Sequence, residues 1–307
     1  QTADELNNGR SDNVLAGYGG YVWSITGYNT ANTFVRRYDP AADAWTQIAG
    51  SQPSWGSNYA RSGCHPTTGT AQNKVFIYGD AATTGFTGLR SYNMDTNTWA
   101  TETPSGTAPA LTGIWAPAWA YDPDSGYCYL TGGANVPGAG TLNSVYVYDP
   151  VTNAWLSPLP NFTTVRDFHA AYVFDRPSDG HKQLCVAGGN SAGAGLDSVE
   201  CYDFVTAAWG TAGTLPVSAW GMGYDVTLIG GEPQLWIVAG VLDDNLSNET
   251  LYYNATTGEW ISGGTLASTT GVYRTSAVVS DGNLYHVGGR TSVNPVPFSD
   301  VLHVCPT

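Results

Sequence analysis

Short apolar runs, each stopped by glycine, recur along the whole chain. They are rich in β-branched and aromatic residues, which is typical of β-strands that end at a turn. No segment has the 3.6-residue periodicity of a long helix. The pattern therefore predicts an all-β protein. The runs end at Gly27, Gly79, Gly133, Gly189, Gly240 and Gly289.

A second regularity follows each apolar run. A polar stretch leads to another strand that carries a tyrosine, and after a tight turn a tryptophan stands seven residues beyond that tyrosine. A further apolar strand precedes each run, as at residues 169–175. Four short strands per unit and a period of about 50 residues indicate a repeat architecture. The pairs are Tyr38 and Trp45, Tyr92 and Trp99, Tyr148 and Trp155, Tyr202 and Trp209, and Tyr253 and Trp260.

This arrangement resembles the kelch repeat, in which a hydrophobic run, a Gly-Gly doublet, a spaced Tyr and a Trp follow one another. The full doublet is present at residues 132–133, 188–189 and 288–289. The resemblance covers nearly the whole chain and implies a β-propeller with one four-stranded blade per unit. A physical reason points the same way. A small sheet cannot bury both faces alone, whereas radially arranged blades bury them against each other.

The repeat predicts a single domain, a six-bladed propeller over residues 1–307. The last unit is incomplete, because Val304 stands where its tyrosine belongs and the chain ends at Thr307. We expect residues 2–7 to supply the missing outer strand, with Leu6 turned inward. The predicted blades span residues 12–49, 57–103, 113–159, 166–215, 218–266, and 272–307 together with 1–11.

Composition narrows the class of partner. The formal net charge is −14, and Lys74 and Lys182 are the only lysines. Nucleic acids and anionic membranes attract basic surfaces, so neither is an expected partner. No stretch of 18 apolar residues is present, and membrane insertion is not expected.

The sequence starts at Gln1. Loss of a signal peptide would explain that start, as would a shortened chain, and we expect an extracellular, secreted or periplasmic protein.

The chain has five cysteines. Cys185 and Cys201 lie on consecutive predicted strands and stand roughly opposite each other across the hairpin, which predicts a disulfide between them. Two buried thiols are the alternative. The pairing of Cys64, Cys128 and Cys305 is left open. The spacings Cys-x-x-Cys and His-x-x-x-His do not occur, so neither a metal nor another cofactor is predicted.

Candidate binding residues collect where the chain leads into the first strand of each blade. Trp55, Trp115 and Trp220 lie there outside the tyrosine–tryptophan steps, as does Tyr273. In propellers of this kind we expect ligands at this end of the central channel. Exposed rings would stack on sugars or on apolar side chains of a partner. The alternative is that they fill the channel mouth.

Basic residues gather at the same places. Arg61, Arg166 and Arg274 come from different blades, and guanidinium groups suit carboxylates in a ligand or in the protein itself. They would form an anion-recognising ring, or each would pair with an aspartate such as Asp12. His169 adds an acid–base group next to Arg166, although such a local cluster is more often structural.

Two functions fit these residues. The first is an extracellular, non-catalytic binding or assembly module for a protein or glycan partner, copies of itself included. The alternative is a carbohydrate-active enzyme, epimerase-like or lyase-like, with its site around Arg61, Arg166, His169 and Arg274. An open polar pocket at the channel mouth would favour the enzyme, and an aromatic rim would favour the binding module.

Overall fold

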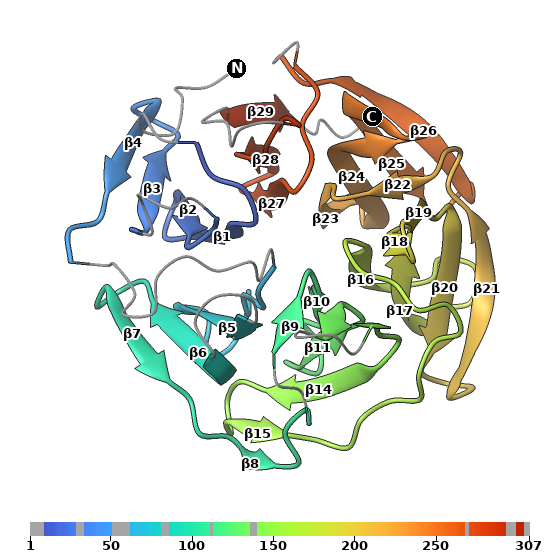
Figure 1. Ribbon diagram of the computed structural model, residues 1–307, viewed down its shortest axis with the longest axis horizontal. Helices are drawn as coiled ribbons and strands as arrows, with labels where there is room; N and C mark the ends of the chain where they lie inside the picture. The colour runs from blue at the N-terminus through green and yellow to red at the C-terminus, as the bar shows by residue number, and fades with distance from the viewer. Residues whose placement is uncertain are drawn as a thin grey trace.

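The structure is a computed structural model. It describes residues 9–28, 34–50, 62–80, 86–110, 113–135, 140–267, 270–292 and 299–303. Within these ranges every regular element is a β-strand. The strands form small antiparallel sheets that stand around a common centre, and successive sheets follow one another around it (Figure 1). This all-β arrangement fits a β-propeller.

Two sheets have the predicted order of four consecutive strands, in which each strand pairs with the next. The first contains β1 (Val14–Tyr18), β2 (Tyr21–Ile25), β3 (Arg36–Asp39) and β4 (Ala44–Gln47). The other contains β16 (Ala170–Asp175), β17 (Lys182–Ala187), β20 (Ser198–Asp203) and β21 (Ala208–Thr214). The small hairpin of β18 (Asn190–Ser191) and β19 (Ala194–Gly195) lies between β17 and β20 in sequence.

The remaining sheets vary this plan. One has three strands, β5 (Lys74–Asp80), β6 (Phe86–Asn93) and β7 (Thr98–Thr101). The next contains β10 (Ala118–Tyr121), β11 (Cys128–Thr131), β14 (Val145–Asp149) and β15 (Ala154–Trp155), and β8 (Ser105–Gly106) adds a parallel outer strand. Beside it lie β9 (Ile114–Trp115), β12 (Ala134–Asn135) and β13 (Gly140–Thr141). The following sheet has five strands, β22 (Ala219–Trp220), β23 (Gly223–Ile229), β24 (Glu232–Leu242), β25 (Asn245–Asn254) and β26 (Glu259–Thr265). The last sheet has three, β27 (Ser276–Ser280), β28 (Asn283–Val287) and β29 (Ser299–His303).

The seven-residue step from Tyr to Trp is a hairpin between the third and fourth strands. In each of the five units the two residues stand directly opposite each other, as Tyr38 does to Trp45. In the first three units the tyrosine hydroxyl then donates a hydrogen bond to an Asp or Asn in the turn, for example over 2.7 Å to Asp43. That turn residue has a positive φ, which Asp and Asn tolerate well. The same bond recurs at Asn97 and Asn153.

The second glycine of the doublet at residues 188–189 is needed for its backbone conformation and for a close contact. Gly189 has φ 102°, and a Cβ there would lie 2.8 Å from the carbonyl oxygen of Asp167. Only glycine fits such a backbone and such an approach. The first position of the three doublets has a left-handed backbone with φ between 52° and 73°, a conformation that Thr26 and Ala239 also adopt. The doublet can therefore lose its first glycine and keep its shape, whereas the second unit keeps the first, Gly79, and carries Asp80 at the second position.

The start of the described chain contacts the last sheet. The amide of Asp12 donates to the carbonyl of Arg274 over 2.9 Å, and the amide of Gly289 donates to the carbonyl of Arg10 over 2.8 Å. The hydroxyl of Ser276 also donates to the carbonyl of Asn13. The closing strand predicted at residues 2–7 lies outside the described residues.

Two disulfides are present in the part of the chain that the structure describes. The predicted bridge between Cys185 and Cys201 joins directly opposed residues of β17 and β20. The other joins Cys64, which is bridged to Phe76 of β5, to Cys128 of β11 in the next sheet. This second bridge therefore fastens two neighbouring sheets together. Cys305 lies outside the described residues.

Candidate binding face at the channel mouth

A chain of backbone hydrogen bonds links the sheets where their first strands begin. One residue from each of five units has a left-handed backbone: Asp12, Ala116, Phe168, Gly221 and Arg274, with φ between 49° and 67°. Four of their amides, all but that of Ala116, donate to the carbonyl of the corresponding residue in the preceding unit around the centre. The four bonds measure 3.0 Å for Phe168 to Ala116, 3.0 Å for Gly221 to Phe168, 2.6 Å for Arg274 to Gly221 and 2.9 Å for Asp12 to Arg274. This left-handed ring fixes the inner ends of the sheets relative to one another.

Aromatic rings gather on the left-handed ring. Trp115, Phe168, Trp220 and Tyr273, here called the axial aromatic cluster, come from four consecutive units. Their rings meet edge to face, with centroids 5.1 Å, 5.8 Å and 5.5 Å apart along the series. Phe168 is buried, whereas the other three rings are half-buried. The cluster thus presents aromatic surface to solvent with little freedom to move.

Arg274 borders this cluster but is already neutralised. Its Nε lies 2.9 Å from both carboxylate oxygens of Asp12, and its Nη2 also contacts Asp12. Its guanidinium carbon lies 5.9 Å from the centre of the Trp115 ring and 6.0 Å from that of Phe168. Asp12 is fully buried. The pairing of Arg274 with Asp12 is one of the two alternatives that the sequence left open.

Arg166 does not reach the surface. Its side chain is fully buried, and its Nη2 donates to Glu200 over 2.7 Å while Nη1 donates to the carbonyls of Gly188 and Ser198. Burial lowers the pKa of Arg166, although Glu200 opposes that shift. The expectation that Arg166 recognises a ligand at the mouth is therefore corrected: it cross-links β17 and β20 to the chain before β16.

His169 is also internal, which corrects its expected place at the mouth. It is fully buried, and its Nε2 lies 2.9 Å from the hydroxyl of Thr131. A Cβ at Gly132 would come within 2.7 Å of the His169 ring, so the ring packs under the glycine doublet. Arg166 pairs with Glu200 and His169 with Thr131, so the two do not form one acid–base cluster. Trp55 and Arg61, the other predicted site residues, lie outside the described residues.

A cavity of about 550 Å³ runs along the first strands β1, β10, β16, β23 and β27. Tyr224 of β23 lines it. The Tyr224 hydroxyl accepts a hydrogen bond from the amide of Trp119 over 3.0 Å and donates one to the carbonyl of Trp119 over 3.1 Å. Asp225 lines the wall, where it accepts bonds from the amides of Val226 and Val279 over 2.8 Å and 2.6 Å. Burial raises the pKa of Asp225 to about 6, and those two amide bonds only partly offset it.

The raised pKa of Asp225 predicts a pH dependence of stability. The folded protein holds this proton to a higher pH than the unfolded chain does, so ionisation favours unfolding. The contribution of Asp225 to stability should therefore fall as the pH rises from about 4 to about 6. We expect the free energy of unfolding of the wild type, minus that of Asp225→Asn, to decrease over this window in urea titrations.

The control for that experiment is Asp203→Asn. Hydrogen bonds from the Thr206 amide and from His181 lower the pKa of Asp203 to about 2, so its stabilising contribution is lost as the pH falls. The Asp203 difference should rise with pH between about 2 and about 4 and then level off, whereas the Asp225 difference should fall between about 4 and about 6. A flat curve for Asp225→Asn between pH 4 and pH 6 would contradict the prediction.

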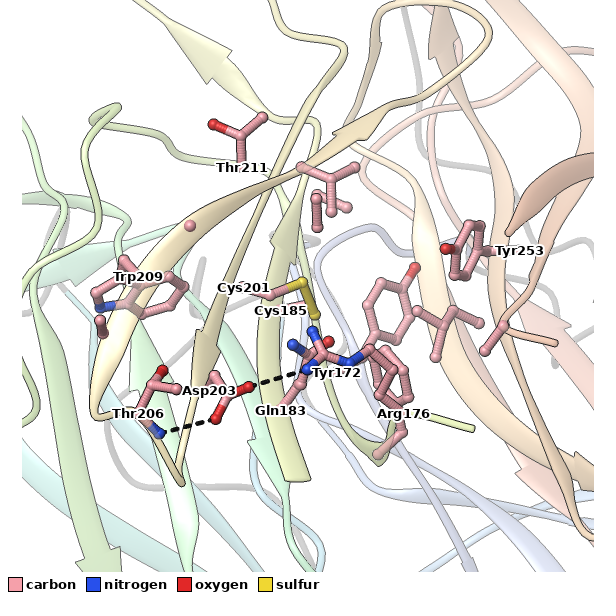
Figure 2. Close-up of a pocket in the computed structure, with 18 of the residues that line it drawn as sticks. Tyr172, Arg176, Gln183, Cys185, Cys201, Asp203, Thr206, Trp209, Thr211 and Tyr253 are labelled. Atoms are coloured by element: carbon pink, nitrogen blue, oxygen red, sulfur yellow. Dashed lines mark hydrogen bonds and ion pairs between the residues drawn. A yellow bond between two sulfur atoms is a disulfide. The ribbon is translucent and has the colours of Figure 1, made fainter. Parts of the chain in front are cut away.

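A second pocket, of about 440 Å³, lies between the β16–β17–β20–β21 sheet and the sheet that contains β24, β25 and β26. Figure 2 shows the Cys185–Cys201 disulfide at its centre, with Trp209 and Tyr253 on opposite sides. At one end Asp203 accepts bonds from the Thr206 amide over 3.0 Å and from Arg176 over 3.2 Å. Sequence reasoning found the disulfide but missed this pocket.

Comparison with known proteins supports the repeat. The family described as Kelch motif matches residues 124–157, a stretch that contains the doublet at residues 132–133 and the Tyr148 and Trp155 pair. A search of curated proteins gave no match. The match confirms the resemblance inferred from the repeat.

Proposed function

For this chain, which belongs to the kelch-repeat proteins, we propose the role of an extracellular binding module without catalytic activity. It meets a protein or glycan partner, further copies of itself included, through the axial aromatic cluster. Kelch motifs generally mediate contacts between proteins, which is consistent with such a module. The rigid sheets hold the surface, and the chain segments between them carry the recognition.

The axial aromatic cluster is the observation that carries this proposal. Trp and Tyr are the residues that most often dominate binding energy at interfaces, because they present a large apolar area and lose little freedom on binding. Trp115, Trp220 and Tyr273 are half-buried and are held by the edge-to-face contacts of their rings. Neither of the two pockets described above includes them. Half-buried aromatic rings of this kind suit stacking on a partner's side chains or on a sugar ring.

The enzyme alternative has less support. It relied on Arg166, His169 and Arg274 at an open mouth, together with Arg61. Arg166 and His169 have no exposed surface, and Arg274 is neutralised by Asp12. Among the described residues these side chains therefore stabilise the sheets, and they do not converge on a site where a proton could be moved.

The location and architecture belong to the same proposal. Disulfides persist mainly in oxidising compartments, so the two bridges are compatible with an extracellular protein. The described residues contain no helix that could cross a membrane.

We infer six blades with the boundaries expected from the repeat and closure by residues 1–11. The contacts of Asp12 and Arg10 with the last sheet support that closure.

Trp220→Ala tests the binding face. We expect binding to weaken at least tenfold, because an anchoring aromatic ring contributes about 2 kcal/mol or more. Sedimentation velocity over a concentration series would measure self-association, and a glycan array would measure sugar binding. The matched control is Leu228→Ser, an exposed apolar residue on β23 that is outside the cluster. Equal binding by Trp220→Ala and the wild type would contradict the proposal.

A further inference from the structure

One register position on the second strand of each sheet is almost always aromatic. In the first five units it follows directly after the residue that stands opposite the repeat tyrosine. In the last sheet it follows Leu284, which stands opposite Leu302, so Leu302 takes the place of the tyrosine that the sequence analysis assigned to Val304. β17 is the exception, because its residue at this position is a cysteine. In chain order the residues are Trp23, Phe76, Tyr129, Cys185, Trp236 and Tyr285.

The rings at this position fill the gap to the next sheet. The centroid of Phe76 lies 5.3 Å from that of Tyr148, the repeat tyrosine of the following unit. Trp23 meets Tyr92 in the same way at 6.4 Å. Tyr285 of the last sheet lies 6.1 Å from Tyr38 of the first. The position therefore supplies the ring that one sheet presents to its neighbour.

In the β16–β17–β20–β21 sheet that ring is replaced by smaller groups. Cys185 is bonded to Cys201, and the residue opposite Cys201 on β21 is Gly210. A Cβ at Gly210 would have no atom within 4 Å. The aromatic residue of this row stands one strand further in, at Tyr172, whose hydroxyl donates to the carbonyl of Trp236 over 2.7 Å. The outer half of the gap is left without a ring.

The pocket of about 440 Å³ occupies that place, and this volume is typical of sites for small organic ligands. Tyr253 and Trp260 of the next sheet line it and are half-buried. The view in Figure 2 shows the disulfide in the position between Tyr253 and Trp209. The next sheet thus keeps the two rings that would pack on the replaced aromatic.

The polar groups of the pocket favour a neutral ligand. Arg176 and Asp203 are paired with each other over 3.2 Å, and Asp179 also contacts Arg176. The remaining polar lining includes the amide of Gln183 and the hydroxyls of Thr206 and Thr211. A charged group would have to displace the existing pairs, whereas a neutral donor or acceptor would not.

We propose that this pocket binds a neutral planar aromatic ring of phenol or indole size, which takes the place of the ring that the other sheets carry themselves. The ring belongs either to a free small molecule or to a Tyr or Trp side chain of a partner protein. The apolar part of the pocket accepts an aromatic ring readily, because water gains little by filling it.

Indole, measured by isothermal titration calorimetry, is the first probe. Gly210→Leu should weaken its binding at least tenfold, because the added side chain projects into open space in the pocket and mimics Leu156, which follows Trp155 as Gly210 follows Trp209. Cys185→Phe with Cys201→Ala restores the missing ring and should have the same effect. Thr46→Leu, at this position on β4 in the first sheet, is the matched control and should bind as the wild type does.

A third variant separates the pocket from the disulfide. Cys185→Ala with Cys201→Ala removes the bridge but adds no side chain, so indole binding should persist.

Comparison of free indole with N-acetyl-tryptophanamide identifies the source of the ring. Tighter binding of the amide indicates a partner's side chain, and tighter binding of indole indicates a small molecule. No indole binding by the folded wild type, or equal binding by wild type and Gly210→Leu, would overturn the proposal. Neither result depends on the axial aromatic cluster.

Discussion

Replacement of Glu200 by alanine should lower the free energy of unfolding by about 3–5 kcal/mol, the usual cost of leaving a buried charge without its partner. Glu200 pairs with the fully buried Arg166 over 2.7 Å and accepts the amides of Thr163 and Thr164 over 2.7 Å and 3.1 Å. The substitution leaves a cation and two amides without this acceptor in the interior. Urea-induced unfolding, followed by circular dichroism, would measure the change.

Two further variants sharpen this measurement. Glu200→Gln keeps a carbonyl oxygen for the guanidinium or for an amide, so its loss should be smaller than that of Glu200→Ala. Glu259→Ala removes an exposed carboxylate from β26 and should change stability by no more than about 0.5 kcal/mol. A loss below about 1 kcal/mol for Glu200→Ala would mean that the pair is not a buried cross-link.

Removal of the disulfide between Cys64 and Cys128, by alanine at both positions, should cost about 4 kcal/mol. The bridge spans 64 residues of sequence and joins two neighbouring sheets, so its loss gives the unfolded chain much more freedom. The midpoint of thermal or urea unfolding of the double variant, compared with the wild type, would measure the effect.

The second disulfide is a natural control for the first. Cys185 and Cys201 are 16 residues apart, so the same reasoning predicts a smaller loss of about 3 kcal/mol for their replacement by alanine. The ordering of the two losses is the critical result. A larger loss at Cys185 and Cys201 than at Cys64 and Cys128 would contradict the argument from loop length.

Much of the architecture could be predicted because it is local in sequence. The step from Tyr38 to Trp45 is a hairpin, whose register follows from a short turn. Glycine stops and apolar runs likewise mark single strands and their ends. The pairing of Cys185 with Cys201 could be predicted for the same reason, since the two residues lie on consecutive strands.

The features that the sequence did not reveal depend on which side chains meet when residues far apart in the sequence are brought together. Cys64 and Cys128 come from different units, and their pairing requires the relative height of two sheets. Arg166 and Glu200 are 34 residues apart, and the charge of Arg166 alone suggested an exposed role. The pocket beside Cys185 could have been found by aligning the units, because the cysteine interrupts a column of aromatic residues.

The left-handed ring has a consequence for how this surface could diversify. Its hydrogen bonds use only backbone atoms, and the side chains at its positions are as different as those of Asp12, Ala116, Phe168, Gly221 and Arg274. The hydrogen bonds of the ring therefore do not depend on which side chains stand at or beside it. A new specificity could arise from exchanges at the half-buried residues beside this ring, Trp115, Trp220 and Tyr273, with every strand left in register, and these positions are the natural ones to randomise in a designed library.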